Sequence, residues 1–162
     1  MTQDELKALL EYDPETGVWI WRQRRNSRAD VGSVAGFVRK ADGYRIIGNV
    51  FGKNRKSSRL AWFYMTGYWP DYDIDHVNGD KADDRWCNLR AATVTQNIAN
   101  GRTRKDNASG VKGVDLYRGR WRAQIQVEGR KRHLGYFGTI EAASAAYVAA
   151  AKLAFGEFFK EG

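Results

Sequence analysis

Asp73-Ile74-Asp75-His76-Val77-Asn78-Gly79-Asp80 is the stretch around which the chain is organised. Its few apolar residues predict one short strand that ends near His76. Asn78-Gly79 is a strong turn signal and opens an acidic loop. Residues 89–92 predict a second short strand. The pattern is therefore strand, loop, strand, with an Asp and a His side by side at the end of the first strand.

A helix is predicted to follow the second strand. Thr93-x-x-Gln96 matches a capping box, in which the two side chains each bind the other's backbone N–H. The helix would begin at about residue 94, with Asn97 in its first turn. Because helical side chains tilt toward the N-terminus, Asn97 is expected to point back toward the strand ends.

These side chains can perform metal-assisted phosphate chemistry. Asp75 is a hard oxygen ligand suited to Mg²⁺ or Mn²⁺, and Asn97 offers a neutral amide oxygen as a second ligand. His76 can take a proton from water near neutral pH. Asn88 can hydrogen-bond the imidazole and fix its orientation. A metal held there would stabilise charge on a scissile phosphate.

Each residue also has an ordinary structural explanation. Asp75 could be a turn or cap carboxylate, and a single His beside a strand is more often packed in a core. Asn88 and Asn97 could simply hydrogen-bond loops. Three further acidic residues are expected to order the loop first and to bind a metal second: Asp80, Asp83 and Asp84.

The charge pattern favours a polyanionic partner. The net charge is +8 at pH 7, and residues 22–59 carry 11 basic and 2 acidic side chains. Residues 101–137 carry 10 basic and 3 acidic side chains, whereas residues 60–100 between them carry 3 basic and 6 acidic ones. Two basic segments around an acidic one are what a metal site between phosphate-binding surfaces requires. A generally basic, solubilising surface is the alternative.

Several classes of protein are disfavoured by composition. The single cysteine, Cys87, excludes an internal disulfide and a thiolate zinc site, which fits a reducing cytoplasm. No apolar run approaches the roughly 20 residues that a membrane span needs. The N-terminal residues lack the basic and apolar regions of a signal peptide. At 162 residues the chain is one large domain or two small ones.

The central motif resembles the HNH endonucleases of phages and mobile introns, in their His-Asn-Asn form. The residues that carry the resemblance are Asp75-His76-Val77-Asn78-Gly79-Asp80-Lys81, Asp83-Asp84-Arg85, Asn88-Leu89-Arg90, Thr93 and Gln96-Asn97. Upstream, Tyr12-Asp13-Pro14-Glu15-Thr16-Gly17, Gly43-Tyr44 and Arg59-Leu60-Ala61-Trp62 resemble segments of such phage proteins. The resemblance covers roughly residues 6–100.

This resemblance implies a ββα-metal fold, one divalent cation per active site, and cleavage that leaves a 5′-phosphate and a 3′-hydroxyl. By position, it implies that Asp75 and Asn97 bind the metal, that His76 is the base and that Asn88 orients it. One departure concerns Ser58, where many relatives have a His before the Arg-Leu-Ala-Trp segment. If that His assists phosphate binding, activity here is expected to be weaker or differently tuned.

The C-terminal part predicts a second module. Residues 112–117, 121–127 and 131–137 predict three strands, and Thr139 predicts the cap of an alanine-rich helix that runs to about Phe155. This part resembles the plant ethylene-response-factor (APETALA) DNA-binding domain. The resemblance rests on Ser109-Gly110-Val111-Lys112-Gly113-Val114, Arg120-Trp121-Arg122-Ala123-Gln124-Ile125, Leu134-Gly135-Tyr136-Phe137 and Glu141-Ala142-Ala143. It implies a three-stranded sheet placed in the major groove of DNA.

Two groups of residues are predicted to contact double-stranded DNA. In the second module, strand alternation places Arg120, Arg122, Gln124 and Gln126 on one face. On the third strand, Arg130 and Arg132 would be close by, with Lys131 or His133 as alternatives, and Arg118 completes the candidates. In the first module, the basic segment is expected to contact phosphates through Arg22, Arg24, Arg25, Lys53, Arg55 and Lys56.

The sequence therefore predicts an α+β protein: a ββα-metal HNH nuclease module (1–100), a basic linker (101–110) and a DNA-binding domain with a three-stranded antiparallel sheet on one helix (111–162). The expected activity is a Mg²⁺- or Mn²⁺-dependent phage homing or nicking endonuclease of the host-cell cytoplasm, with no membrane partner. A DNA-binding regulator with an idle nuclease centre and a restriction or defence nuclease remain alternatives. The oligomeric state stays open.

Overall fold

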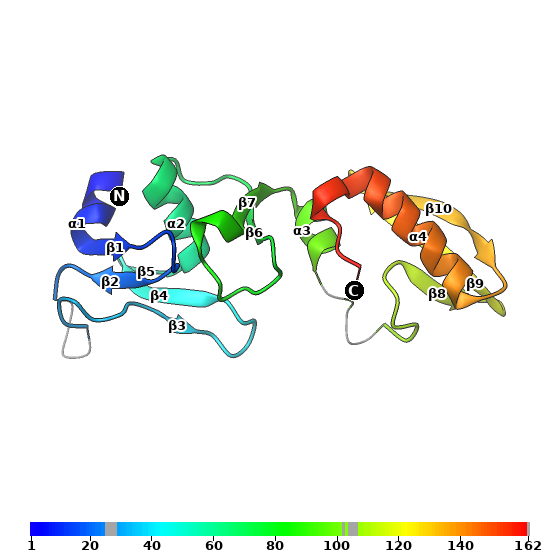
Figure 1. Cartoon of the computed structure of the whole chain (residues 1–162), viewed down its shortest axis with the longest axis horizontal. Coiled ribbons are helices and arrows are strands. Elements are labelled where there is room, and N and C mark those ends of the chain that lie inside the picture. Colours follow the sequence, from blue (N-terminus) through cyan, green and yellow to red (C-terminus); the bar gives the residue numbers. More distant parts are fainter. Residues whose placement is uncertain (25–28, 102, 104–106, 162) are drawn as a thin grey trace. The chain divides into compact units, whose positions relative to one another are not determined.

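The computed structural model of the chain describes residues 1–24, 29–101, 103 and 107–161. These residues form mixed α/β structure with four α-helices and several small sheets (Figure 1). They divide into two compact units, Met1–Ala91 and Ala92–Gly162. The expected module limits and the linker 101–110 remain predictions, because residues 102 and 104–106 lie outside the described part. No helix in the described part is long and apolar enough to span a membrane.

The first unit begins with helix α1 (Gln3–Leu9), followed by the antiparallel strands β1 (Leu10–Tyr12) and β2 (Trp19–Trp21). A capping box starts α1: Thr2 Oγ1 accepts from the Glu5 N–H at 3.2 Å, and the Glu5 carboxylate accepts from the Thr2 N–H at 2.7 Å. Residues 13–17 turn between the two strands and end at Gly17, whose φ is 70°.

A second antiparallel sheet contains β3 (Phe37–Val38), β4 (Arg45–Val50) and β5 (Lys53–Lys56), in that order. The turn between β4 and β5 is short, because Lys53 pairs directly with Val50. Phe51 and Gly52 make this turn with positive φ values. Helix α2 (Ser57–Thr66) starts directly after β5.

The core of the first unit is formed by α1, the two sheets and α2. Its largest fully buried apolar side chains are Leu6, Leu10, Trp19, Ile47, Val50 and Leu60. The Trp19 indole N–H donates to Ser57 Oγ at 2.9 Å, which satisfies the one polar group of that ring. Ser58, at the position where the family resemblance implies a His, is buried in the first turn of α2.

The predicted central elements are present. Strand β6 (Asp73–His76) and strand β7 (Leu89–Ala92) form a two-stranded sheet, with the 3-10 helix η1 (Trp86–Asn88) directly before β7. Helix α3 (Val94–Asn100) follows in the second unit. The predicted capping box is formed, since Thr93 Oγ1 accepts from the Gln96 N–H at 3.2 Å and the Gln96 side chain accepts from the Thr93 N–H at 2.8 Å.

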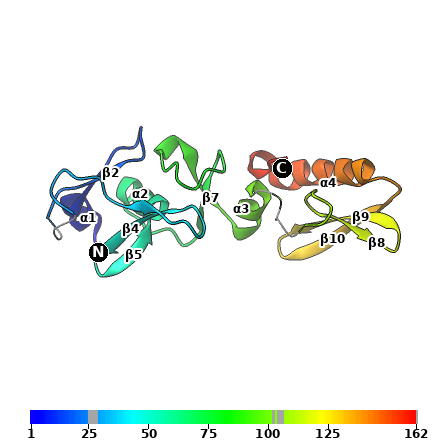
Figure 2. The ribbon, with the colours of Figure 1, turned by 90° about the horizontal axis from the view of Figure 1, so that it is seen from below.

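In the second unit, an antiparallel sheet of order β10-β9-β8 lies along helix α4 (Figure 2). Its strands are β8 (Val114–Tyr117), β9 (Arg120–Val127) and β10 (Arg130–Phe137), and α4 spans Ile140–Phe155 before the 3-10 helix η2 (Gly156–Phe158). Small residues of α4 pack in a core with one face of the sheet; the core includes Val114, Ala123, Ile125, Ala143, Tyr147 and Ala151. Thr139 caps α4, as predicted.

The strand register decides which side chains share the outer face of this sheet. Residues Arg120, Arg122, Gln124 and Gln126 alternate with the buried Ala123 and Ile125 and face away from α4, as expected. The register places Lys131, His133 and Tyr136 from β10 on that face, because they pair with Gln126, Gln124 and Arg122. Arg130 and Arg132, which the sequence analysis placed nearby, pair with Val127 and Ile125 and so share the helix-facing side.

Candidate active site

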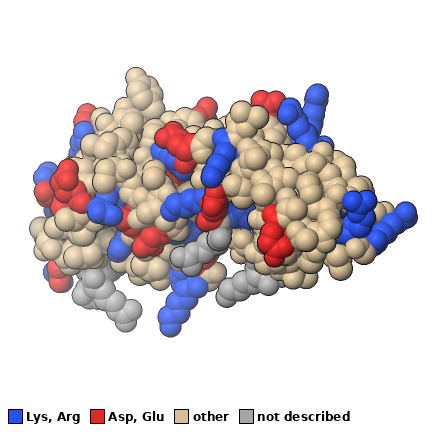
Figure 3. All heavy atoms as spheres, turned by 45° about the vertical axis from the view of Figure 1, so that its right-hand side comes forward, with Lys and Arg blue, Asp and Glu red and all other residues tan. Residues whose placement is uncertain are grey.

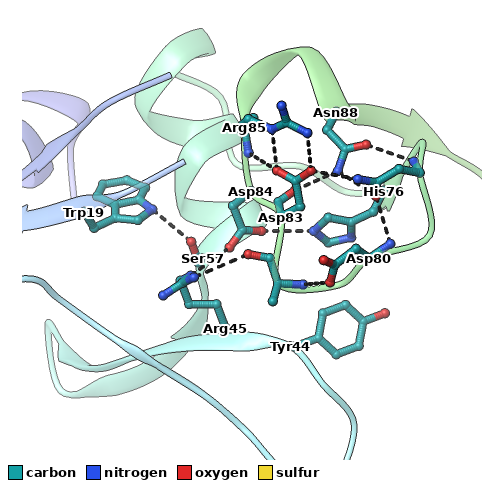
Figure 4. Close-up of polar contacts among 12 residues, drawn as sticks. Trp19, Tyr44, Arg45, Ser57, His76, Asp80, Asp83, Asp84, Arg85 and Asn88 are labelled. Atoms are coloured by element: carbon teal, nitrogen blue, oxygen red, sulfur yellow. Dashed lines mark hydrogen bonds and ion pairs between the residues drawn. The ribbon is translucent and has the colours of Figure 1, made fainter. Parts of the chain in front are cut away.

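His76 lies at the end of β6 with its side chain almost fully buried; the residue is 3% exposed. Its Nε2 is 3.0 Å from Oδ1 of Asp84, a residue on the loop that returns to η1 (Figure 4). The ring of Tyr44, the residue directly before β4, lies 6.1 Å from the imidazole, centroid to centroid. The imidazole is therefore held between a carboxylate and an aromatic ring.

Asp84 is itself buried, with 2% exposure, and lies between His76 and a cation. Arg45 Nε is 3.7 Å from Asp84 Oδ2, within ion-pair distance. Arg45 also donates from Nη2 to the Ala82 carbonyl at 3.5 Å. A buried carboxylate is costly without an opposite charge. The positive charge of Arg45 therefore compensates the negative charge of Asp84 next to His76.

Asn88 binds the loop rather than the imidazole. Its Oδ1 accepts from the Asn78 backbone N–H at 2.9 Å. Its Nδ2 donates to the Asp83 carbonyl at 2.7 Å and to Asn78 Oδ1 at 3.0 Å. The Asn88 carbonyl also accepts from Val77 N–H at 2.9 Å. The expected contact between the Asn88 amide and the ring of His76 is replaced by contacts that close the loop beneath it.

Two of the three loop carboxylates, Asp80 and Asp83, order the acidic loop as expected from the sequence, whereas the Asp84 carboxylate contacts His76 and Arg45. Asp83 accepts from Asn78 Nδ2 at 2.7 Å and from Arg85 Nε and Nη2 at 2.7 and 2.6 Å. These hydrogen bonds, the one from Arg85 first, lower the pKa of the Asp83 carboxyl from 3.8 to about 2. Asp80 Oδ1 accepts from the Ala82 N–H at 3.0 Å.

Asp75 is a buried carboxylate beside the candidate base, 3% exposed, with Arg90 Nε 2.9 Å from its Oδ2. A carboxylate is the hard oxygen type of ligand that Mg²⁺ prefers, so the residue type of Asp75 fits this cation. Asn97, the other expected ligand, lies on α3 in the second unit. Within the described residues, no group of three or more His, Cys, Asp or Glu side chains is placed to hold a metal.

Two lysines lie over the Tyr44 ring, beside the candidate base. The distance from the ring centroid is 3.6 Å for Lys56 Nζ and 4.8 Å for Lys81 Nζ. Burial lowers the pKa of the Lys56 ammonium and raises that of the Tyr44 hydroxyl. Lys56 was a candidate from the sequence, whereas Lys81 was not. The place of Lys81 in the central motif was a sequence signal for a functional residue, but its position over Tyr44 follows only from the folded loop.

The other basic candidates of the first unit are more dispersed. Arg22 and Arg24 form exposed ion pairs with Glu11 and Asp30. Arg55 lies with its guanidinium carbon 4.7 Å from the centre of the Trp69 ring, while Lys53 is exposed at the start of β5. Arg25 lies outside the described residues. On the face shown in Figure 3, basic side chains are interspersed with acidic ones, so net charge alone does not define a DNA surface.

The outer sheet face of the second unit combines basic, amide and aromatic groups. Arg122 forms a two-point pair with Asp115, at 3.2 and 2.7 Å, and Gln124 donates to the same carboxylate at 3.1 Å. The Arg122 guanidinium lies 4.6 Å from the centre of the Tyr117 ring, which stacks on Tyr136. Arg120 donates to the Tyr136 carbonyl at 3.1 Å, and Arg118, in the turn before β9, also lies over Tyr117.

Two comparisons with known proteins found a similarity. Residues 55–99 match the model of a family described as HNH endonuclease, and this segment contains Asp75, His76, Asn88 and Asn97. Protein 3.8 of Escherichia phage T7 is 36% identical over 76 residues, which cover 45% of this chain and 63% of that protein. The match thus spans less than two thirds of that relative's length. No solved structure matches the chain.

These similarities indicate a nuclease and a relationship to a phage protein. They do not extend the family match to the C-terminal part, since the matched segment ends at residue 99. The resemblance of residues 111–162 to APETALA-type domains therefore stays a prediction from the sequence.

Proposed function

We propose that the chain is a metal-dependent DNA endonuclease that hydrolyses phosphodiester bonds to a 5′-phosphate and a 3′-hydroxyl. The match of residues 55–99 with the HNH endonuclease family supports this proposal most directly. Within that segment, Asp75 and His76 are adjacent at the end of one strand, and Asn88 closes the loop that follows. These are the residue types that the proposed reaction needs.

In the proposed mechanism, His76 is the general base and takes the proton of the attacking water on an imidazole nitrogen. Asp75 and Asn97 would hold one divalent cation, Mg²⁺ or Mn²⁺, by a carboxylate and an amide oxygen. When bound, the cation supplies Lewis-acid stabilisation of the scissile phosphate and the leaving oxygen. Asn88 acts by fixing the loop, and Lys56 and Lys81 add positive charge beside the base.

The second unit is proposed to hold double-stranded DNA against the nuclease module. Its three-stranded sheet presents Arg120, Arg122, Gln124 and Gln126 on the face opposite α4, with Arg118 at the adjacent turn. Arginine and glutamine can contact base edges or phosphates from such a face. In the first unit, basic side chains add phosphate contacts; the candidates are Arg22, Arg24, Arg25, Lys53, Arg55 and Lys56.

The proposed setting is a phage or mobile element in the cytoplasm of a bacterial host, where the enzyme acts in homing or nicking. A restriction or defence role would use the same chemistry. A DNA-binding regulator with an idle nuclease centre is the second candidate. The observations that favour the regulator are the deep burial of His76 and the arginine already bound to Asp75.

Cleavage of supercoiled plasmid with Mg²⁺ tests the proposal. The intact protein should nick the plasmid, chelation with EDTA should stop nicking, and His76→Ala should abolish it while DNA binding remains. Leu153→Ala, at a residue 91% exposed on α4, is the matched control and should nick as fast as the unchanged protein. DNA binding without cleavage in Mg²⁺ or Mn²⁺ would favour the regulator. Equal cleavage by His76→Ala would exclude His76 as the base.

A further inference from the structure

We infer that Asp84 is the positioning residue of the candidate base: it fixes which nitrogen of His76 carries the proton. The contact is direct, with 3.0 Å between Asp84 Oδ1 and His76 Nε2, and both side chains are at most 3% exposed. This role rests on the proposed nuclease function, in which His76 takes a proton. Asn88 would then not orient the ring itself, because its amide is engaged by the loop.

The chemistry of the pair determines the tautomer. A neutral imidazole has one N–H, and an ionised carboxylate can only accept a hydrogen bond. With Asp84 as acceptor, the proton of neutral His76 lies on Nε2, which makes Nδ1 the basic nitrogen. A fixed tautomer is a recognised function of a carboxylate behind a catalytic imidazole.

Arg45 makes the burial of this carboxylate possible. Its Nε is 3.7 Å from Asp84 Oδ2, an oxygen for which the described residues provide no hydrogen-bond donor. The cation thus balances the buried charge without replacing the imidazole as the hydrogen-bond donor. A guanidinium that donated to both carboxylate oxygens would also occupy the oxygen that accepts from the His76 Nε2–H.

The backbone of Asp84 is held in place from a distant part of the chain. The Tyr12 hydroxyl donates to the Asp84 carbonyl at 2.6 Å, and Trp86 N–H donates to the Pro14 carbonyl at 2.8 Å. A Cβ on Gly17 would lie 2.6 Å from the Asp84 carbonyl carbon, so the turn of residues 13–17 packs directly on this loop. Positioning of the base therefore begins in the N-terminal hairpin.

The test is the tautomer of His76, read by ¹⁵N–¹H NMR of imidazole-labelled protein without DNA or metal. The chain has two histidines, so His133→Gln assigns the signals. Neutral His76 should be protonated at Nε2 in the intact protein. In Asp84→Asn, whose amide can either accept or donate, the Nδ1–H tautomer should become populated. Asp83→Asn, the same change at the neighbour that binds Arg85, should leave the tautomer unaltered.

Plasmid nicking by the same variants supplies the second readout, with a fall of about 10- to 100-fold expected for Asp84→Asn. A Nδ1–H tautomer in the intact protein overturns the inference even if Asp84→Asn fails to fold. An unchanged tautomer and rate in folded Asp84→Asn also overturn it. An Asp84-dependent tautomer in a protein that cuts no DNA would support the positioning contact and reject the nuclease proposal, so the two failures are distinguishable.

Discussion

Side-chain hydrogen bonds close the loop between β6 and β7, and Asn88 makes several of them. Three side-chain hydrogen bonds join it to Asn78 and Asp83. Asn88→Ala should lower the free energy of unfolding by about 1–3 kcal/mol, because partly buried loop groups lose their partners. Urea denaturation measures the loss. Asn54→Ala, which removes one exposed hydrogen bond to Asn49, is the control and should cost less. Equal losses would contradict the loop-closing role.

Asp83 should make stability depend on acid. Its folded pKa of about 2 lies below the ordinary value of 3.8, mainly because Arg85 donates to it. The ionised folded state is favoured, so the stabilisation is complete above pH 3.8 and is lost as pH falls through about 2. Denaturation of Asp83→Asn across this range should show a shallower pH dependence than the unchanged protein. Asp71→Asn, at an exposed aspartate, should retain the steep dependence; a similar flattening there would refute the assignment.

At the scale of elements, glycine decides how closely β8 approaches α4. Gly113 has φ 66°, and a Cβ there would lie 2.2 Å from the Tyr147 ring of α4. Gly119 has a similar φ of 77° but nothing within 4 Å. Both alanine variants should lose about 1–2 kcal/mol for the left-handed conformation. Gly113→Ala should lose about 1–3 kcal/mol more, from overpacking. Thermal unfolding of the pair compares them, and equal midpoints would contradict the close packing.

Elements with local signals could be predicted from the sequence. The helix starts after Thr93 and Thr139 were predicted correctly, because a cap is made within four residues of the chain. The face on which each β10 residue lies could not be predicted, because it depends on register across a two-residue turn: Arg130 pairs with Val127, which places Arg130 and Arg132 on the helix-facing side.

In the candidate site, too, local sequence signals predict some features, whereas contacts between distant residues leave no such signal. The motif makes Asp75, His76 and Asn88 candidates, but it carries no signal for the contact between Asp84 and His76. This contact depends on Tyr12, which is 72 residues from Asp84 in sequence, and on the cation of Arg45 from another sheet. No periodicity or spacing rule connects these residues. Asp84 therefore looked like one more acidic loop residue.

At the scale of the whole molecule, DNA affinity and cleavage should be separable. Cleavage is proposed to depend on the first unit, around His76, and much of the DNA affinity on the outer sheet face of the second. Removing the charges of Arg120 and Arg122 by substitution with Gln should weaken DNA binding and reduce its salt dependence. Each lost phosphate contact lowers the slope of log K against log salt by about 0.9. His76→Ala should leave affinity and slope unchanged.

Fluorescence-anisotropy titrations at several salt concentrations measure both quantities on the same duplex. Lys152→Gln is the charge-matched control, because Lys152 lies on α4 and pairs with Glu161, away from the outer face. If the outer sheet face binds DNA, only the Arg120 and Arg122 variants change the slope, and cleavage at saturating protein stays near the original rate. If Lys152→Gln changes the slope equally, binding reflects overall charge, and the sheet face has no special part in holding the DNA.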